Sequence, residues 1–531
     1  MHKFFFALIL LLASVLRLVK LDTFPPALNW DEVSLGYNAY SLLLTGADEW
    51  GVSFPTIFRA FGDYKLPTYV YATTPIIKLL GPTDLAVRLP SALAGILTVA
   101  VAYVLGHRLF GRQAGLITAL LVALEPWTLF LSHLALEANL AVLLLALGLA
   151  LLVSRKFPSA LLFLSLSAWT YNSTRLFVPL FLLSYVLLKH RYLLSFFRPR
   201  KLRLGFCLVV LAVFWLPLFV QLLSPGAQSR LRWLTILDSG AIATIENFRL
   251  QSTFPPPLTR LLYNRPVYFA STALTNYLSY LSPKFLFVSG GDHYQFNVQG
   301  HGLLYLVNLP LFYLGILLLL TSKTLKHKSL IILWLLLAPI PGSLVRDAPH
   351  TLRAITFVPL PMFLSAYALD RLGRKFRRLF PLYVLVVLLS CGYYLSVALT
   401  NYARSYSSSF QYGHRQLVDY LKLHFDEYDD ILVTKKYGEP HAFMLFYWPW
   451  NPDFYRSDPH LVRYGRSDWF WVDSFSKFRF INDWDMPGVV AALDPDRKVL
   501  IVASPDNPPP ATDLAVINFL DGSPAFLLKE K

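Results

Sequence analysis

The chain has 531 residues, of which 55% are hydrophobic and 15% are charged, and its mean hydropathy is +0.48. In a soluble domain about 25% of the residues are charged. This shortage of charge, together with apolar runs close to the ~20 residues that cross a bilayer, excludes a purely soluble protein and predicts a polytopic membrane protein. Cys207 and Cys391 are the two cysteines, and both lie in apolar runs, which excludes a disulfide framework and a cysteine-based metal site.

The apolar runs predict about eleven transmembrane helices. The first run, Phe4 to Leu16, is short enough for a signal peptide, but no small-residue cleavage site follows it, so we expect an uncleaved helix. The other runs fall at 88–109, 114–131, 137–153, 158–174, 175–188, 204–223, 302–320, 329–345, 352–369 and 380–400.

Charge placement predicts the orientation of these helices. The loops after the even-numbered runs hold 18 Lys or Arg against one acid, Asp370. Because basic loops stay in the cytoplasm, we expect a cytoplasmic N-terminus in the plasma (inner) membrane and a C-terminus outside it. Outer loops then comprise 22–87 and 224–301. Residues 67–80 contain two prolines and Lys78, which favours a helix at the membrane surface over a twelfth span.

The segment 401–531 differs from the predicted transmembrane domain, 1–400. It holds 14 basic and 18 acidic residues, a net charge of −4, and strand-like runs at 430–434 and 498–503. This pattern predicts a small extracytoplasmic α/β domain. Five of the twelve tryptophans lie in it. They could stack on sugars, but packing in a core or at the membrane interface is the interpretation we favour.

Charged residues of the outer loops are the candidates for chemistry. The adjacent acids Asp31 and Glu32 follow the first helix, and a carboxylate near the bilayer can act as a general base or bind a cation. The alternative for Asp31 is a helix cap. Lys65, beside Asp63, suits the phosphate of an anionic lipid, although a lysine that extends to the interface would give the same pattern. Glu137 falls on the same predicted side.

The predicted topology brings further polar residues to this outer surface. They are Arg175, His293, His301 and Arg353. Acids that could act on a hydroxyl and bases that could bind a phosphate are therefore expected on one side of the membrane.

At these positions the sequence resembles the polyprenyl-phosphate-sugar-dependent glycosyltransferases of the C superfamily. The branch includes protein O-mannosyltransferases and the aminoarabinose transferase of lipid A, and the resemblance covers about residues 1–370. Each motif is weak alone, and their ordered set is more specific. The matching elements are Asp31-Glu32, Tyr64-Lys65-Leu66-Pro67, the stretches 88–95 and 109–115, Glu137-Ala138-Asn139 and 350–354.

The resemblance implies a GT-C type fold of about eleven transmembrane helices. It also implies an inverting transfer of a hexose or pentose from a polyprenyl-phosphate carrier to the hydroxyl of a protein, lipid or glycan acceptor outside the cytoplasm. Asp31 would be the base, with Glu32 and Glu137 as further catalytic acids. Three groups would bind the donor phosphate, namely Lys65, Arg175 and Arg353. The supporting residues would be Asp63, Tyr64, Arg88 and His350.

Some members of this superfamily use a divalent cation with a loop histidine. His293 and His301 are the candidate ligands here, and the resemblance leaves the use of a metal open. A transporter or flippase of lipid-linked saccharides is the alternative function, but such proteins usually show paired repeats, which this sequence lacks. An oligosaccharyltransferase is disfavoured because residues 448–453 do not match the Trp-Trp-Asp motif of that group.

Overall fold

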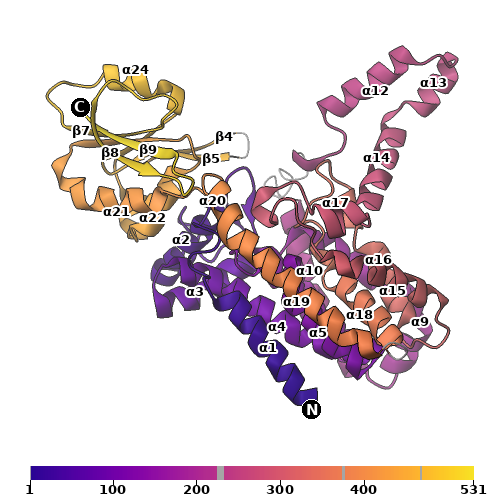
Figure 1. The fold of residues 1–531 in the computed structure, drawn as a ribbon. Coiled ribbons are helices and arrows are strands. Elements are labelled where there is room, and N and C mark those ends of the chain that lie inside the picture. Colours follow the sequence, from indigo (N-terminus) through magenta and orange to yellow (C-terminus); the bar gives the residue numbers. More distant parts are fainter. Residues whose placement is uncertain (1, 224–232, 374–376, 467–468) are drawn as a thin grey trace. The chain divides into compact units, whose positions relative to one another are not determined.

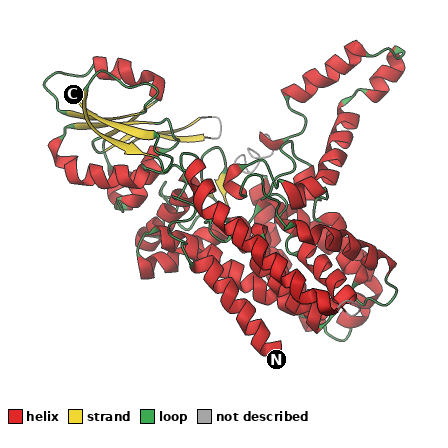
Figure 2. Ribbon diagram, in the orientation of Figure 1, coloured by secondary structure: helices red, strands yellow, loops and turns green. Residues whose placement is uncertain are grey.

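The computed structural model describes residues 2–223, 233–373, 377–466 and 469–531, which are mainly helical (Figure 2). Residues 224–232 of the predicted second outer loop, and Arg374 and Lys375 of a predicted basic loop, lie outside the described residues. Internal contacts divide the chain into two compact units. One comprises Met1–Leu16, Ala94–Leu131 and Ala138–Tyr394, and the other Arg17–Leu93, Ser132–Glu137 and Leu395–Lys531.

Four helices have residues in both units, because the chain passes between the units several times. They are α1 (His2–Leu18), α4 (Asp84–Phe110), α7 (Glu137–Val153) and α19 (Phe380–Val397).

The first unit is a bundle of apolar helices (Figure 1). In it α18 packs against α5 and α15. A Cβ atom at Gly315 of α15 would lie 2.2 Å from the carbonyl oxygen of Leu364, so this close approach of two helices requires glycine. The helices of this unit are α5 (Arg112–Leu124), α6 (Pro126–Leu131), α8 (Phe157–Ala168), α9 (Asn172–Phe197), α10 (Lys201–Leu222), α12 (Ser239–Gln251), α13 (Pro256–Leu262), α14 (Arg265–Ser279), α15 (Leu309–Thr321), α16 (Lys328–Leu337), α17 (Ile340–Ser343) and α18 (Leu360–Gly373).

Among the described residues, four helical segments are long and apolar enough to cross a membrane: α4, α9, α10 and the continuous helix Phe380–Ser405. Several apolar helices of the first unit are shorter, between 10 and 17 residues. The chain is an integral membrane protein, and the number of about eleven spans stays a prediction.

Several helix boundaries differ from those predicted from hydropathy, and two of them have a clear local cause. The run 114–131 is broken, because Glu125 is extended, with ψ 141°, and Pro126 begins α6. A residue before proline avoids the helical conformation. The predicted boundary between 174 and 175 is also wrong, since α9 begins at Asn172, after the extended Tyr171. Hydropathy cannot locate such breaks, because apolar residues continue across them.

The first part of the second unit carries the predicted outer loop. It contains α2 (Trp30–Thr45), a hairpin of β1 (Phe58–Arg59) with β2 (Tyr64–Lys65), and α3 (Pro67–Leu80). A helix was predicted at 67–80, and α3 confirms it.

The C-terminal part of this unit is a seven-stranded sheet with helices. The strand order is β4-β5-β6-β3-β7-β9-β8, with β3 parallel to β6 and β7 and the other pairs antiparallel. The predicted strands at 430–434 and 498–503 are confirmed as β3 and β7. The elements are α20 (Ala403–Ser405), α21 (His414–His424), β3 (Asp430–Thr434), α22 (Pro440–Tyr447), α23 (Pro452–Ser457), β4 (Val462–Arg466), β5 (Trp469–Phe475), β6 (Phe478–Ile481), α24 (Met486–Ala491), β7 (Val499–Ala503), β8 (Thr512–Asn518) and β9 (Pro524–Glu530).

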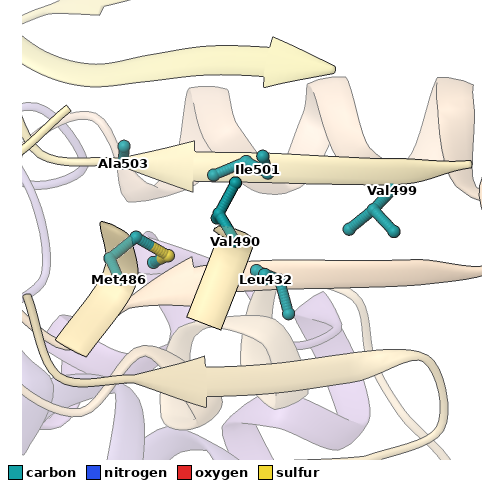
Figure 3. Close-up of a cluster of buried hydrophobic side chains, with 6 residues drawn as sticks. All are labelled: Leu432, Met486, Val490, Val499, Ile501 and Ala503. Atoms are coloured by element: carbon teal, nitrogen blue, oxygen red, sulfur yellow. The ribbon is translucent and has the colours of Figure 1, made fainter. Parts of the chain in front are cut away.

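Helices cover the two faces of this sheet unequally. Figure 1 shows α21 and α22 on one side and α24 on the other. The short α24 buries Met486 and Val490 against Leu432, Val499 and Ile501 of the central strands (Figure 3). Because α24 has only six residues, it covers β3 and β7 and leaves the β4–β5 end of this face open.

Candidate active site

The N-terminus of α2 positions the two adjacent acids of the first loop. Asn29 is the N-cap, because its side chain accepts a hydrogen bond from the backbone N–H of Glu32 at 3.0 Å. The Glu32 carboxylate in turn accepts from the backbone N–H of Asn29 at 3.2 Å, which completes a capping box. The alternative that Asp31 caps this helix is therefore wrong, and its carboxylate is available for another role.

Asp31 pairs with Lys65. The Lys65 ammonium lies 2.7 Å from Oδ1 of Asp31, and the side chains are 11% and 43% exposed, respectively. Burial alone lowers the pKa of Lys65, but the charges of Asp31, Glu137 and Asp63 outweigh it and raise this pKa above its ordinary value. The site thus holds a charged ammonium group beside a carboxylate that solvent can reach.

Glu137 is the first residue of α7 and is half-buried. It is close enough to Lys65 for its charge to raise the pKa of that lysine. An acid in the first turn of a helix is also stabilised by the helix dipole. Asp31, Lys65 and Glu137 therefore form one electrostatic group.

Glu32 points away from this group, into the interior. Its carboxylate receives two hydrogen bonds from the Arg88 guanidinium, at 3.0 and 3.1 Å, and a third from the backbone N–H of Ala135 at 2.8 Å. The side chains of Glu32 and Arg88 are 1% and 0% exposed. Arg88 also donates to the carbonyl oxygens of Leu21, Pro25 and Ala27. The geometry therefore favours a positioning role for Glu32, with Arg88 in the predicted supporting role.

Asp63 and Tyr64 shape the hairpin that carries Lys65. Asp63 accepts a hydrogen bond from the backbone N–H of Tyr64 at 2.7 Å. Gly62, with φ +74°, makes the turn, and a Cβ atom there would meet the ring of Trp469 at 2.8 Å. Only glycine fits this turn, which sets the start of β2 and hence the position of Lys65.

The remaining predicted residues belong to the first unit. Arg175 donates to the carbonyl oxygen of Ala168 and to the side chain of Gln221. Arg353 forms an ion pair with Asp347 at 3.2 Å and donates to its carbonyl oxygen. Their predicted contact with the donor phosphate stays a prediction.

The histidines fall into two places in the first unit. The rings of His293 and His350 lie 5.9 Å apart, whereas His301 lies beside Tyr393 and Tyr394. No group of three or more metal-binding side chains was found among the described residues. The role of His293 and His301 as metal ligands is thus still a prediction.

Known proteins share parts of the sequence and the fold of this chain. A family model described as dolichyl-phosphate-mannose-protein mannosyltransferase matches residues 65–219, a segment that includes Lys65, Arg88, Glu137 and Arg175. No curated protein sequence matches the chain. The apo structure of ArnT from Cupriavidus metallidurans is 13% identical, with 99% of this chain and 97% of ArnT covered at a TM-score of 0.55.

The predicted resemblance is confirmed. The chain resembles the C-superfamily glycosyltransferases in the sequence of residues 65–219 and in its fold. ArnT bound to undecaprenyl phosphate is 12% identical over 99% of this chain and 97% of that one, with a TM-score of 0.44. The apo oligosaccharyltransferase of Archaeoglobus fulgidus is 14% identical over 84% of this chain and 63% of that one, with a TM-score of 0.47.

Two buried acidic groups were not singled out from the sequence. Glu125 breaks the predicted run 114–131 and accepts hydrogen bonds from the backbone N–H of Tyr305 and the side chain of Asn308. An acid inside an apolar run was the available signal. Its contacts indicate that it secures the break between α5 and α6.

The second group joins the first outer loop to the C-terminal sheet. His441 lies between Glu49 and Glu439, with ring nitrogens 3.6 and 3.4 Å from their carboxylates. Burial lowers the pKa of His441, but the two acids outweigh it and raise the pKa to about 9. No local pattern predicts this cluster, because Glu49 is distant in sequence from the other two residues.

Proposed function

We propose that the chain is an inverting glycosyltransferase that moves a monosaccharide from a polyprenyl-phosphate carrier to an acceptor hydroxyl outside the cytoplasm. The observation that carries the proposal is the contact of Asp31 with Lys65, next to Glu137. A proton acceptor and a phosphate-binding cation are the two groups that a direct displacement needs. The family match over residues 65–219 supports the lipid-phosphate donor.

Asp31 acts as the base in this mechanism. Its carboxylate takes the proton of the acceptor hydroxyl as the oxygen attacks the anomeric carbon, and the bond from that carbon to the phosphate oxygen breaks. The attack comes from the face opposite the leaving group, so the configuration inverts. Glu32 does not share this step, because its buried carboxylate is bound by Arg88 and two backbone N–H groups.

Lys65 stabilises the leaving group. Its ammonium has three donors, so a lipid phosphate can bind to it beside the Asp31 carboxylate. The negative charge on the phosphate grows as the glycosidic bond breaks, and a fixed cation stabilises that charge. The charges of Asp31 and Glu137 raise the pKa of this lysine and favour its protonated form.

The same comparisons support a lipid carrier for the donor sugar. ArnT from Cupriavidus metallidurans, which shares the fold, binds undecaprenyl phosphate. We therefore infer that the phosphate at Lys65 belongs to a polyprenyl chain in the bilayer.

The proposal is tested with the purified chain in lipid nanodiscs and a panel of undecaprenyl- and dolichyl-phosphate sugars. We expect at least one donor to lose its sugar, with free polyprenyl phosphate detected by mass spectrometry. Asp31→Asn protein is the control that measures spontaneous hydrolysis of the donor. If lipid-linked sugars cross the bilayer of proteoliposomes intact while no donor is consumed, the chain is a flippase.

A further inference from the structure

The C-terminal sheet has an open trough that the proposed mechanism does not use. Its volume is about 1130 Å³, slightly above the roughly 300–1000 Å³ that is typical of small-molecule sites. Its lining comes from β4, β5 and β6 and from the start of α24.

Five aromatic side chains line this trough: Phe478 and Phe480 are buried in its base, and Tyr464, Trp471 and Trp484 are less buried. Tyr464 and Trp471 face each other across β4 and β5. Trp484 is 74% exposed, so the core does not account for it. The positive C–H edge of a sugar ring packs well on the electron-rich face of such rings, which act as flat platforms.

A β-bulge supplies polar groups beside these rings. The pairing of β4 with β5 moves from Val462–Ser474 to Arg463–Val472, so Asp473 has no partner in the ladder. Its carboxylate instead forms an ion pair with Lys435, whose ammonium lies 5.4 Å from the centre of the Trp471 ring. A bulge that places a polar side chain beside an aromatic platform is typical of a binding site rather than of a core.

The charges of the trough favour a neutral ligand. Its lining holds three acids and three bases, in addition to one histidine. Mixed charges of this kind suit hydroxyl groups, because each hydroxyl can both donate to a carboxylate and accept from a cation. A phosphate or a nucleic acid would require an excess of positive charge. The charged residues are Asp430, Asp473, Asp485, Lys435, Arg466 and Arg479.

Aromatic contacts connect the trough with the candidate active site. Trp471 stacks on Trp469 with ring centres 5.5 Å apart, and Trp469 meets the ring of Trp30 at 6.4 Å. Trp30 directly precedes Asp31, the proposed base. The row of rings that begins at Trp471 in the trough thus ends at the residue that precedes that base.

We propose that this trough binds a neutral oligosaccharide that belongs to the acceptor. The assignment to the acceptor rests on the proposed function, whereas saccharide binding by the trough does not. The volume supports an acceptor over the donor, because the donor brings a single sugar ring and the trough is larger than one ring requires.

Binding is tested by calorimetry on the full chain in detergent. The ligands are neutral tetrasaccharides of glucose, mannose and N-acetylglucosamine. We expect at least one to bind, and Trp484→Ala to weaken that binding about 2- to 12-fold, the effect of losing one aromatic contact. Trp471→Leu should do the same. The matched control is Phe454→Ala, because Phe454 is an exposed aromatic residue outside the trough.

Two results with saccharide ligands overturn the proposal. One is the absence of saccharide binding to the parent protein, and the other is unchanged affinity in both tryptophan variants. Binding of a Ser/Thr-rich peptide that Trp484→Ala abolishes would assign the trough to a protein acceptor and also overturn it. Donor turnover is measured separately, and Trp484→Ala should raise the KM for the acceptor. Failure of donor turnover in the parent protein would instead contradict the proposed function.

Discussion

Two adjacent carboxylates, Asp31 and Glu32, have different surroundings because of their positions in α2. Glu32 is the third residue of the helix, so its side chain folds back to the N-cap and meets Arg88 in the interior. Asp31, one residue earlier, points to Lys65 and solvent. A shift of about 100° around a helix thus separates a positioning residue from the proposed base.

The Asp31→Asn variant tests whether Asp31 is the general base. Because Asn29 provides the cap, the variant should keep the stability of the parent. Transfer should fall by about 10²–10⁴ because the proton acceptor is lost. Rates are measured by release of polyprenyl phosphate, and Asp22→Asn, an exposed acid of the same loop, serves as the control. Turnover at the parent rate would remove Asp31 from the mechanism and leave Glu137 as the next candidate.

Lys65→Ala tests the phosphate contact. It removes a charge-assisted contact worth about 1.5–3 kcal/mol, so donor binding should weaken roughly 10- to 150-fold. The measurement is a titration with undecaprenyl phosphate. Lys78→Ala, at an exposed position in α3, should bind the lipid like the parent. Equal affinity in Lys65→Ala protein would show that Lys65 does not contact the phosphate.

At the scale of elements, the Glu32–Arg88 pair joins α2, α4 and the segment after α1. Arg88 donates to three carbonyl groups of residues 21–27 as well as to Glu32, so one guanidinium orders the loop that leads into the site. The backbone N–H of Ala135 adds the segment before α7. These contacts explain how elements far apart in sequence hold Asp31, Lys65 and Glu137 together.

Arg88→Met should destabilise the protein by about 3–5 kcal/mol, because Glu32 would keep a buried charge without its partner. The melting temperature should therefore fall clearly, unlike that of Asp31→Asn protein. Thermal unfolding in detergent measures the effect. The double variant Arg88→Met/Glu32→Gln should recover part of the loss, and a double variant no more stable than Arg88→Met would contradict this account.

His441 predicts a pH dependence for the contact between the first outer loop and α22. Its folded pKa of about 9 lies above the ordinary value of 6.5, so the folded state holds its proton more tightly. The stabilisation, about 3 kcal/mol, is complete below pH 6.5 and is lost as the pH rises through about 9. Melting temperatures of His441→Gln and parent protein should differ most near pH 6 and converge near pH 10.

The control for this experiment is His460→Gln, since His460 is 72% exposed. It should follow the parent at every pH. A constant difference between His441→Gln and parent protein from pH 6 to 10 would show that His441 is neutral in the folded state.

At the scale of the whole molecule, basic loops predict the orientation. The 18-to-1 ratio of basic to acidic residues in the even-numbered loops predicts a C-terminus outside the cytoplasm. Alkaline phosphatase fused after residue 531 should therefore be active, since it folds only outside. A fusion at residue 155, in a predicted cytoplasmic loop, is the inactive control. If only the fusion at residue 155 were active, the orientation of the chain in the membrane would be the opposite of the predicted one.

Local patterns in the sequence were sufficient for the membrane class, the C-terminal strands and the helix at 67–80, whereas the roles of Asp31, Lys65 and Glu137 stay predictions. These features could be predicted because hydropathy and the alternation of apolar and polar residues depend directly on which residues are buried. The break at Glu125–Pro126 and the cap at Asn29 arise from adjacent residues that hydropathy does not register, whereas the burial of Glu32 depends on Arg88 and Ala135, which are distant in the chain. The partners of Glu49, Glu32 and Trp30 lie in later segments, so only the tertiary structure could distinguish the exposed acid from the buried ones.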